Sequence, residues 1–527
     1  MTEFNYKALQ NGSDIRGIAL SGIKDEAQNL LPHDAGRLAK GFLLWLSKKT
    51  GKLPVKLKIS IGYDPRLSGK PLQRGIIDEI GPYGVTIFTC GLSSTPAMFM
   101  STIFPEYDCD GAIMITASHL PYNRNGFKYF DKNGGLNKSD ISQIIDYAEN
   151  DSQLETLGEK ITADSFKRIL GKLAYPSIDI PLMDTYSEYL RQLIIDGVGN
   201  EQPLKGLKIT VDAGNGGGGF YAYKVLAPLG ADISSGQFLE PDGTFPNHAP
   251  NPEDKQAMHS ICMAVLNKGA DLGLIFDTDV DRSAAVDSRG REISRNGIVA
   301  MAAALVAEEH PGTTIVTDSI TSDQLNIFLE QKLGLKHLRF KRGYKNVINE
   351  SIRLNKEGID SQLAIETSGH AAFKENYFLD DGAYLATKIV IKAARLMADG
   401  KTVDCMIADL EEAKEAKEVR LPILDSNFSA YGDQLLADMI TWVNLGDLPQ
   451  YPNTGMALVE PNYEGVRISF DKEYGDGWCL LRKSLHDPIM PLNLESNTDG
   501  GIQRMTERLL YFLKSYNLDL TPLEKLI

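Results

Sequence analysis

The chain contains 527 residues, of which 43% are hydrophobic and 24% are charged, and its formal net charge is −15. This composition excludes a disordered or fibrous protein, and the length predicts three or four domains rather than one core. The acidic balance argues against nucleic acid as a partner, because nucleic acid selects a basic protein face.

The N-terminus shows no apolar signal core, and the longest nearly apolar run, residues 297–307, is too short to span a bilayer. We expect that run to be a buried helix. Five scattered cysteines without a CxxC pair predict reduced thiols. These features predict a soluble cytoplasmic protein with no membrane partner.

Short strand-like runs alternate with helical periodicity along most of the chain, which predicts an α/β fold. The first expected domain spans 1–184 and the second spans 185–295. Their expected strands are 56–64, 84–91, 111–118, 207–214 and 272–279.

The third expected domain, 296–415, alternates helices and strands so regularly that it requires parallel strands with crossover helices. The acidic segment 411–418 is predicted to be a helix-rich link. The last expected domain, 416–527, mixes strands and two helices in a different order. The sequence therefore predicts four domains: three similar mixed α/β sandwich-like units followed by a smaller α+β C-terminal domain.

Residues 113–130 read IMITASHLPYNRNGFKYF and place Ser118 and His119 where an apolar strand ends. We expect a turn to follow, carrying Arg124 and Lys128. A displayed hydroxyl beside cations suits a phosphoryl-transfer nucleophile. The alternative is an ordinary turn, because Ser, Pro, Asn and Gly are turn-forming residues.

The segment DTDVDR follows a predicted strand at 277–282. On an extended segment Asp277, Asp279 and Asp281 would point the same way and would repel one another without a cation. Oxygen ligands favour Mg²⁺ or Ca²⁺. An EF-hand is excluded because Arg282 stands where that loop needs glycine. A phosphatase loop with Asp277 as nucleophile, and a solvated acidic turn, remain open.

The glycine run GNGGGG at 214–219 formally satisfies GxGxxG and has Asp232 downstream, as a dinucleotide site requires. Close backbone packing or a tight turn is the simpler interpretation, and we favour it.

Three more polar loops follow predicted strands: AIETSGH (364–370), FKRGYKN (340–346) and LLRKSLHDP (480–488). In open parallel sheets, ligands bind at the carboxyl ends of strands. Arg482, Ser484 and His486 make the last loop rich in donors that suit phosphate. A capped turn is the alternative for the first of these loops, and surface-exposed charge is the alternative for the last.

Taken in order, these stretches resemble the α-D-phosphohexomutase superfamily of phosphoglucomutases, phosphomannomutases and phosphoglucosamine mutases. The resemblance covers nearly the whole chain and implies four domains around a central cleft. It is carried by SDIRG (13–17), GYDPRLS (62–68), STPA (94–97), TASHLPYNRNGFK (116–128), PDGTFPNHAPNPE (241–253), DTDVDR and ETSGH.

The resemblance implies a role for each matching residue. Ser118 would be phosphorylated, and one of its phosphoryl oxygens would join Asp277, Asp279 and Asp281 in holding Mg²⁺. The remaining roles would be proton transfer by Lys128 and His370, support of the serine loop by Arg16 and His119, contact with the transferring phosphoryl group by Arg282, sugar recognition by Glu366, Ser368, Gly343, Tyr344 and Lys345, and phosphate binding by Arg482, Ser484 and His486.

The sequence departs from the family pattern at two places. RKSLHDP stands where the family commonly has RxSGTEP, so Leu485, His486 and Asp487 replace glycine, threonine and glutamate. Leu120 replaces the asparagine of TASHNP. These changes bear on substrate identity and phosphate affinity more than on reaction type.

The resemblance implies a Mg²⁺-dependent mutase that interconverts hexose 1-phosphate and hexose 6-phosphate, of mannose or glucose, as a monomer or homodimer. The reaction would pass through phosphoserine and a hexose 1,6-bisphosphate. A phosphoglucosamine mutase is the alternative within the family. A phosphatase and a non-catalytic sugar-phosphate-binding protein are the alternatives from other classes.

Overall fold

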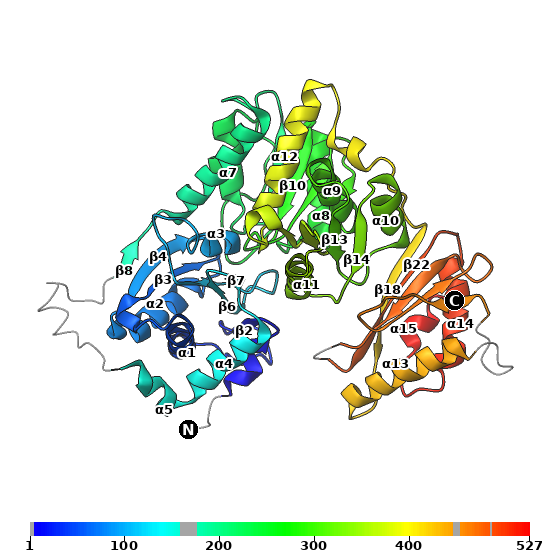
Figure 1. Ribbon diagram of the computed structural model, residues 1–527, viewed down its shortest axis with the longest axis horizontal. Helices are drawn as coiled ribbons and strands as arrows, with labels where there is room; N and C mark the ends of the chain where they lie inside the picture. The colour runs from blue at the N-terminus through cyan, green and yellow to red at the C-terminus, as the bar shows by residue number, and fades with distance from the viewer. Residues whose placement is uncertain (1–4, 159–176, 446–453, 485–486) are drawn as a thin grey trace, which may run out of the picture. The chain divides into compact units, whose positions relative to one another are not determined.

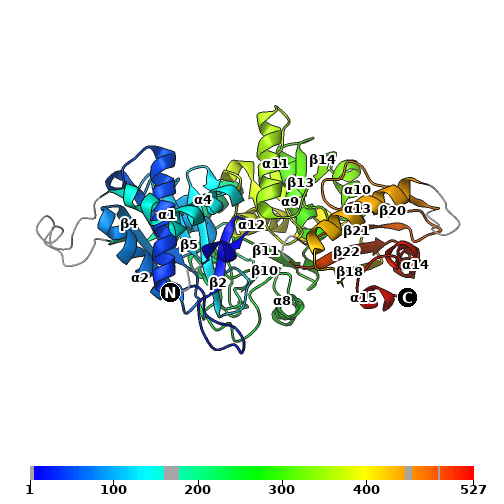
Figure 2. The ribbon, with the colours of Figure 1, turned by 90° about the horizontal axis from the view of Figure 1, so that it is seen from below.

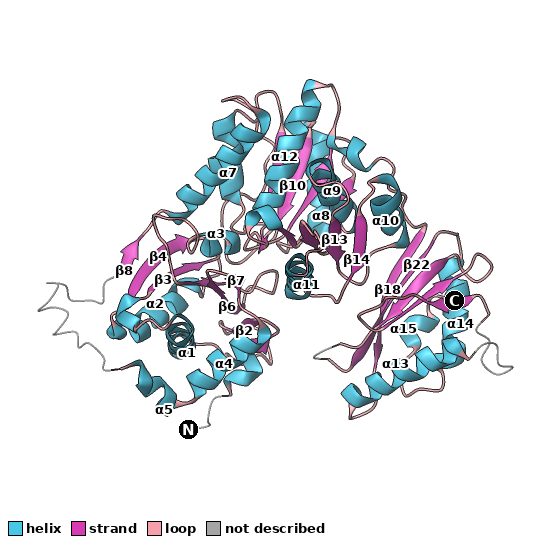
Figure 3. Cartoon of the chain, viewed as in Figure 1, coloured by secondary structure: helices cyan, strands magenta, loops and turns pink. Residues whose placement is uncertain are grey.

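The computed structural model describes residues 5–158, 177–445, 454–484 and 487–527. They fall into two compact units, one made of residues up to 305 with 368–405, and the other of 306–367 with 406–527. Figures 1 and 3 show a mixed α/β protein, and the predicted fold class is confirmed. The division into four domains around a cleft stays a prediction.

The first sheet belongs to the first unit and has the strand order β1-β2-β6-β5-β3-β4-β8. Strands β5, β3, β4 and β8 are parallel, whereas β6 runs antiparallel to both of its neighbours, β5 and β2. The strands are β1 (Gln10–Asn11), β2 (Asp14–Ile18), β3 (Lys58–Tyr63), β4 (Thr86–Leu92), β5 (Gly111–Ile115), β6 (Arg124–Asp131) and β8 (Ser177–Asp179). The prediction of a turn carrying Arg124 and Lys128 is wrong, because both residues lie on β6 and pair with their neighbours in the sheet.

Helices cover both faces of this sheet (Figures 1 and 2). Phe42 of α1 (Pro32–Thr50), Ile76 of α2 (Gly69–Ile80) and Ile144 of α4 (Lys138–Glu149) share one core with Ile113 and Ile115. The short helix α3 (Thr95–Met100) contacts β5 and β6. Alternate residues of β5 are thus apolar toward both layers, which is why residues 111–115 read as a continuous apolar run.

The second sheet, also in the first unit, has the order β12-β11-β10-β9. It consists of β9 (Ile209–Asp212), β10 (Leu272–Phe276), β11 (Ser283–Asp287) and β12 (Glu292–Ile293). Helices α8 (Lys255–Lys268) and α12 (Gly382–Ala398) pack on this sheet, and α7 (Leu182–Val198) packs against α12. The returning segment 368–405 also supplies the antiparallel pair β16 (Ala371–Phe373) and β17 (Leu379–Asp380).

The second unit contains three parallel strands in the order β14-β13-β15, as predicted for this region. They are β13 (Thr314–Thr317), β14 (Lys336–Arg339) and β15 (Leu363–Ile365), with α10 (Asp323–Ile327) and α11 (Tyr344–Lys356) between them. The apolar run at 297–307 is helical, as predicted, within α9 (Asn296–Glu309), and it is largely buried.

The last sheet is antiparallel, in the order β18-β22-β21-β20-β19, and shares a core with α13 (Phe428–Asn444) and α14 (Gly501–Leu513). Its strands are β18 (Glu415–Pro422), β19 (Met456–Leu458), β20 (Val466–Phe470), β21 (Gly477–Leu481) and β22 (Ile489–Ser496). The helix-rich link predicted at 411–418 is wrong, because β18 starts within it and pairs with β22 along its whole length. Strand pairing overrides the helix propensity of Glu, Ala and Lys here.

Within the described part of the chain, no helix combines the length and apolar character that crossing a membrane requires. All five cysteines are free thiols.

Candidate active site

Ser118 lies in the loop that follows β5, with a positive φ of 49° and a buried side chain. Its backbone N–H donates to Thr116 Oγ1 at 2.9 Å, and the Thr116 hydroxyl donates to Asp64 Oδ2 at 2.7 Å. A non-glycine residue at this φ is disfavoured by on the order of 1–3 kcal/mol unless its surroundings hold it. The local network therefore presents the hydroxyl in one defined direction.

Arg16 and His119 both lie beside this loop. Arg16, on β2, donates through Nη1 to the Thr116 carbonyl and through Nη2 to Asp14 Oδ2 at 2.7 Å. The exposed His119 ring places Nδ1 3.4 Å from Ser118 Oγ. Both residues stand where support of the serine loop is expected.

Asp277, Asp279 and Asp281 converge in the turn after β10 and are fully buried. Each offers a carboxylate oxygen, and these oxygens all lie within 4.8 Å of one another. The predicted reason for this convergence is wrong: β10 ends at Phe276, and the residues lie in a turn in which Val280 has a φ of 67°. A tight turn, and not strand alternation, gathers the three carboxylates.

The serine loop and this metal loop (residues 277–282) meet directly. Ser118 Oγ donates to Asp277 Oδ2 at 2.9 Å. The buried Arg282 guanidinium donates to the same oxygen through Nε and Nη2, each at 3.2 Å. Thr95 of α3 donates to Asp279 Oδ2 at 2.5 Å. A phosphoryl group on Ser118 would therefore lie against the carboxylates and Arg282.

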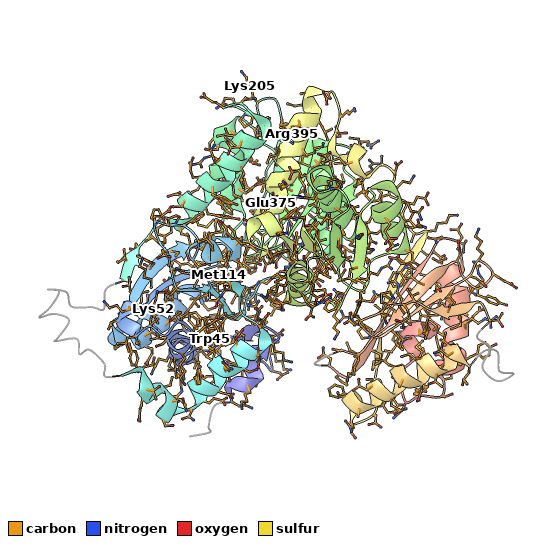
Figure 4. All side chains as sticks on the ribbon, viewed as in Figure 1. Trp45, Lys52, Met114, Lys205, Glu375 and Arg395 are labelled. Atoms are coloured by element: carbon orange, nitrogen blue, oxygen red, sulfur yellow. The ribbon has the colours of Figure 1, made fainter. Side chains whose placement is uncertain are left out.

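Lys128 supplies a second cation from β6. Its register partner on β5 is Met114, which is labelled in Figure 4. Lys128 Nζ bonds Asp281 Oδ2 and lies 3.4 Å from Asp279 Oδ2. The antiparallel pairing of β5 with β6 thus brings Lys128 to the carboxylates that also contact the loop after β5.

Burial and mutual repulsion oppose ionisation of the carboxylates in this cluster. Burial, with Asp281 and Asp279 beside it, raises the pKa of Asp277 well above its usual range. Burial opposes ionisation of Asp281 too, but Lys128 and His370 outweigh it and hold that carboxyl's pKa low. Among the residues that the structure describes, Asp279 Oδ1 and Asp281 Oδ1 are buried without a hydrogen-bond partner. Buried carboxylate oxygens of this kind fit a hard divalent ion.

His370 belongs to the first unit and lies close to Asp281. Its Nδ1 is 2.5 Å from Oδ2 of the buried Asp380 and 4.0 Å from Asp281 Oδ1. Burial lowers the pKa of His370, but Asp380 and Asp281 more than offset this and raise it to about 9. The carboxylate of Asp380 therefore orients and charges the imidazole.

The predicted sugar-recognition residues, except Ser368, lie in the second unit. Gly343, with a φ of 107°, donates its N–H to Glu366 Oε1 at 2.6 Å. Tyr344 and Lys345 follow immediately and open α11. Ser368 is buried in the first unit and precedes Gly369, whose carbonyl accepts from Ser283 N at 3.4 Å.

The predicted phosphate loop also lies in the second unit. Arg482 Nε is buried, with no hydrogen-bond partner among the described residues. Burial and the nearby Arg342 charge lower the pKa of Arg482, while Glu464 and Glu418 oppose them. Ser484 Oγ accepts from Asp487 N at 3.2 Å. His486 lies outside the described residues.

The sequence analysis did not identify several residues that contact the candidate active site. Asp380 had no motif to indicate it. Asp64, Arg66 and Thr95 stand inside GYDPRLS and STPA, but those motifs suggested no role for them.

The close-packing interpretation of the glycine run is supported at Gly219, where a Cβ would lie 2.1 Å from the Leu239 carbonyl oxygen.

Family models described as phosphoglucomutase/phosphomannomutase, alpha/beta/alpha domains I, II and III, match residues 8–155, 184–290 and 294–413. The chain is 26% identical over 451 residues to a phosphomannomutase/phosphoglucomutase from Pseudomonas putida, covering 85% of this chain and 86% of the relative. It is 26% identical over 508 residues to a phosphoglucomutase from Neisseria meningitidis, covering 95% and 96%. A phosphoglucomutase/phosphomannomutase family protein from Burkholderia thailandensis has a similar fold, with a TM-score of 0.74 and 23% identity, covering 96% and 98%.

Proposed function

Because this chain belongs to the phosphoglucomutase/phosphomannomutase family, we propose that it is a cytoplasmic mutase that moves a phosphoryl group between O1 and O6 of a hexose. The observation that carries this proposal is the 2.9 Å bond between Ser118 Oγ and Asp277. It places a nucleophilic hydroxyl on a cluster of three buried carboxylates. A phosphatase with Asp277 as nucleophile would not need that hydroxyl.

Phosphoserine 118 is the proposed phosphoryl donor. The bond from Ser118 Oγ to phosphorus breaks as the bond from phosphorus to the sugar oxygen forms, and the product is a hexose 1,6-bisphosphate. In the second half of the cycle the other phosphate returns to Ser118, so no net phosphate is consumed. Arg282 stabilises the charge on the transferring group, because it bonds the same Asp277 oxygen that accepts from Ser118.

The proton movements are assigned to two residues. His370, held by Asp380 through Nδ1, must first give up its Nε2 proton, and in that neutral form it takes the proton of the attacking sugar hydroxyl at Nε2. Lys128 returns a proton to Ser118 Oγ as the serine becomes the leaving group. Asp277, Asp279 and Asp281 hold the metal, which we propose to be Mg²⁺ and which neutralises phosphoryl charge when bound.

The non-reacting phosphate needs a separate anchor, for which we propose Arg482 and Ser484. Arg342 and Arg420 add positive charge to the surroundings of Glu418 and Arg482. This charge offsets the missing Gly-Thr-Glu of the family loop. Glu366, together with the backbone of Gly343 and the side chains of Tyr344 and Lys345, is the proposed contact for sugar hydroxyls.

We propose mannose and glucose phosphates as substrates, with glucosamine phosphate as the runner-up. The test is a coupled assay on all three sugar 1-phosphates, with Mg²⁺ and a catalytic amount of the bisphosphate. Ser118→Ala is the decisive variant, and intact mass reports its phosphorylation. We expect wild type to carry one phosphoryl group and the variant to lose both that group and nearly all turnover. A variant that still turns over favours the phosphatase, and binding without conversion by wild type favours a non-catalytic protein.

A further inference from the structure

Arg66 is a buried cation in the first unit to which the mechanism assigns no role. It belongs to the GYDPRLS stretch and follows β3, and its side chain is 0% exposed. A guanidinium has five N–H donors in a fixed fork. In this structure those donors have five oxygen partners: Asp64 Oδ2 and the backbone carbonyls of Ser118, Leu120, Pro121 and Arg124.

The four carbonyls belong to the segment from Ser118 to Arg124, so one side chain bonds the serine loop along its length. The bonds to Leu120 and Pro121 are 2.6 Å each, and the bond to Arg124 is 3.2 Å. Asp64 neutralises the guanidinium and also receives the Thr116 hydroxyl, which in turn holds Ser118 N. The positive φ of Ser118 is thus fixed from both sides, by Arg66 on its carbonyl and by Thr116 on its amide.

The segment 241–253, which we call the bracket, packs against Arg66 and its neighbour Pro65. Gly243 lies so close that a Cβ would be 2.3 Å from the Pro65 carbonyl oxygen and 2.9 Å from Arg66 Cα. Phe245 lies with its ring centroid 5.2 Å from Arg66 Cζ. This distance is within the range of a cation–π contact. The motif PDGTFPNHAPNPE therefore packs on the residue that shapes the serine loop.

The bracket also reaches the metal loop. Asn247 donates to Asn215 Oδ1 at 2.7 Å, and the turn at Asn215 continues to Gly217, whose N–H donates to the Thr278 carbonyl at 2.7 Å. At its far end, Glu253 Oε2 lies 3.5 Å from Arg282 Nη1. One segment thus contacts the structures that carry both the nucleophile and the metal ligands.

We propose that Arg66 is a positioning residue that, held by the bracket, sets the distance between Ser118 Oγ and the metal loop. The inference rests on the proposed phosphoserine mechanism. Lysine cannot replace arginine here, because an ammonium has three donors and no planar fork. A displacement of about 1 Å at the reacting atoms can reduce a rate by about 100-fold. Binding of the hexose phosphate, which the proposed function assigns to other residues, should be nearly unaffected.

Three variants test the inference: Arg66→Lys, Phe245→Leu and Gly243→Ala. Arg37→Lys is the matched control, because Arg37 also donates to a carbonyl, of Ala148, and to a carboxylate, of Asp151, but away from the serine loop. For each protein, kcat and KM are measured with glucose 1-phosphate and excess bisphosphate. Intact mass gives the phosphoserine occupancy, and circular dichroism gives the folded fraction at the assay temperature.

We expect kcat of the three variants to fall by about 10- to 100-fold, with KM within about twofold of wild type and the control unchanged. Folded Phe245→Leu and Gly243→Ala proteins with wild-type kcat would overturn the inference. These two variants decide the question if Arg66→Lys does not fold, because both retain the guanidinium. A wild-type protein without phosphoserine or turnover would instead contradict the proposed function.

Discussion

Ser118 and Asp277 share a 2.9 Å hydrogen bond although they are 159 positions apart in the chain. The two residues lie in the loops that follow strands β5 and β10 of different sheets. Arg282, on the same turn as Asp277, bonds the same carboxylate oxygen that accepts from Ser118. The proposed nucleophile and the arginine proposed to stabilise charge thus both bond one atom, Oδ2 of the proposed metal ligand Asp277.

Divalent metal should stabilise the protein as well as activate it. Three buried carboxylates with two unpartnered oxygens repel one another, and a cation relieves that repulsion. At 100 times its dissociation constant a bound ion adds about 2.7 kcal/mol to the free energy of unfolding. Thermal unfolding with and without Mg²⁺ measures this, with sodium chloride of equal ionic strength as control. We expect a higher Tm with Mg²⁺ and a much smaller rise for Asp279→Asn, and an unchanged Tm for wild type would contradict the metal site.

Asp380→Asn should impair catalysis more than substrate binding. Asp380 orients His370 through a 2.5 Å contact and has no proposed contact with substrate. General acid–base catalysis contributes about 100- to 10,000-fold, and misorientation of the imidazole should cost part of that. We expect kcat to fall by about 10- to 100-fold with KM nearly unchanged. A rise in KM at constant kcat would show that Asp380 acts on binding instead.

Arg482→Ala should impair substrate binding more than catalysis. A hydrogen bond to a charged group contributes about 1.5–3 kcal/mol, so loss of the proposed phosphate contact should raise KM by about 10- to 100-fold. Arg508→Ala is the matched control, since Arg508 belongs to the same unit and lies over the Tyr474 ring. Equal KM values for both variants would remove Arg482 from the phosphate site.

His248 should make stability depend on pH. Its Nε2 lies 3.0 Å from Asp212 Oδ2, Nδ1 is 2.9 Å from the Ala249 carbonyl oxygen, and Asp254 is the other charge nearby. Burial lowers the pKa of His248, but these acceptors outweigh it and raise the pKa above 6.5. The protonated folded state is therefore favoured, so this contribution is complete below about pH 6.5 and disappears as pH rises through the folded pKa.

The measurement is urea unfolding of wild type and His248→Gln between pH 5.5 and about 8.5. Other groups titrate in both proteins, so the difference between the two isolates His248. We expect the stability advantage of wild type to shrink as pH rises. A difference that is constant across this range would show that the His248–Asp212 pair does not titrate.

The sequence by itself determined the local elements on which the site is built. Apolar runs predicted β5 and β10, and the residues after each strand predicted a hydroxyl loop and a carboxylate loop. Family-like motifs also indicated Lys128 and His370 in advance. These predictions succeeded because burial period and turn chemistry are local properties of the chain.

Only the tertiary structure decided which of those loops meet. Pairing along β6 and β18 replaced an expected turn and an expected helix, because a hydrogen-bonded neighbour outweighs local propensity. No local pattern indicates that Asp380 lies beside His370, or that the five donors of Arg66 hold the serine loop. These contacts join residues of separate segments of the chain, and the pKa values and orientations of the side chains arise only when burial brings the charges together.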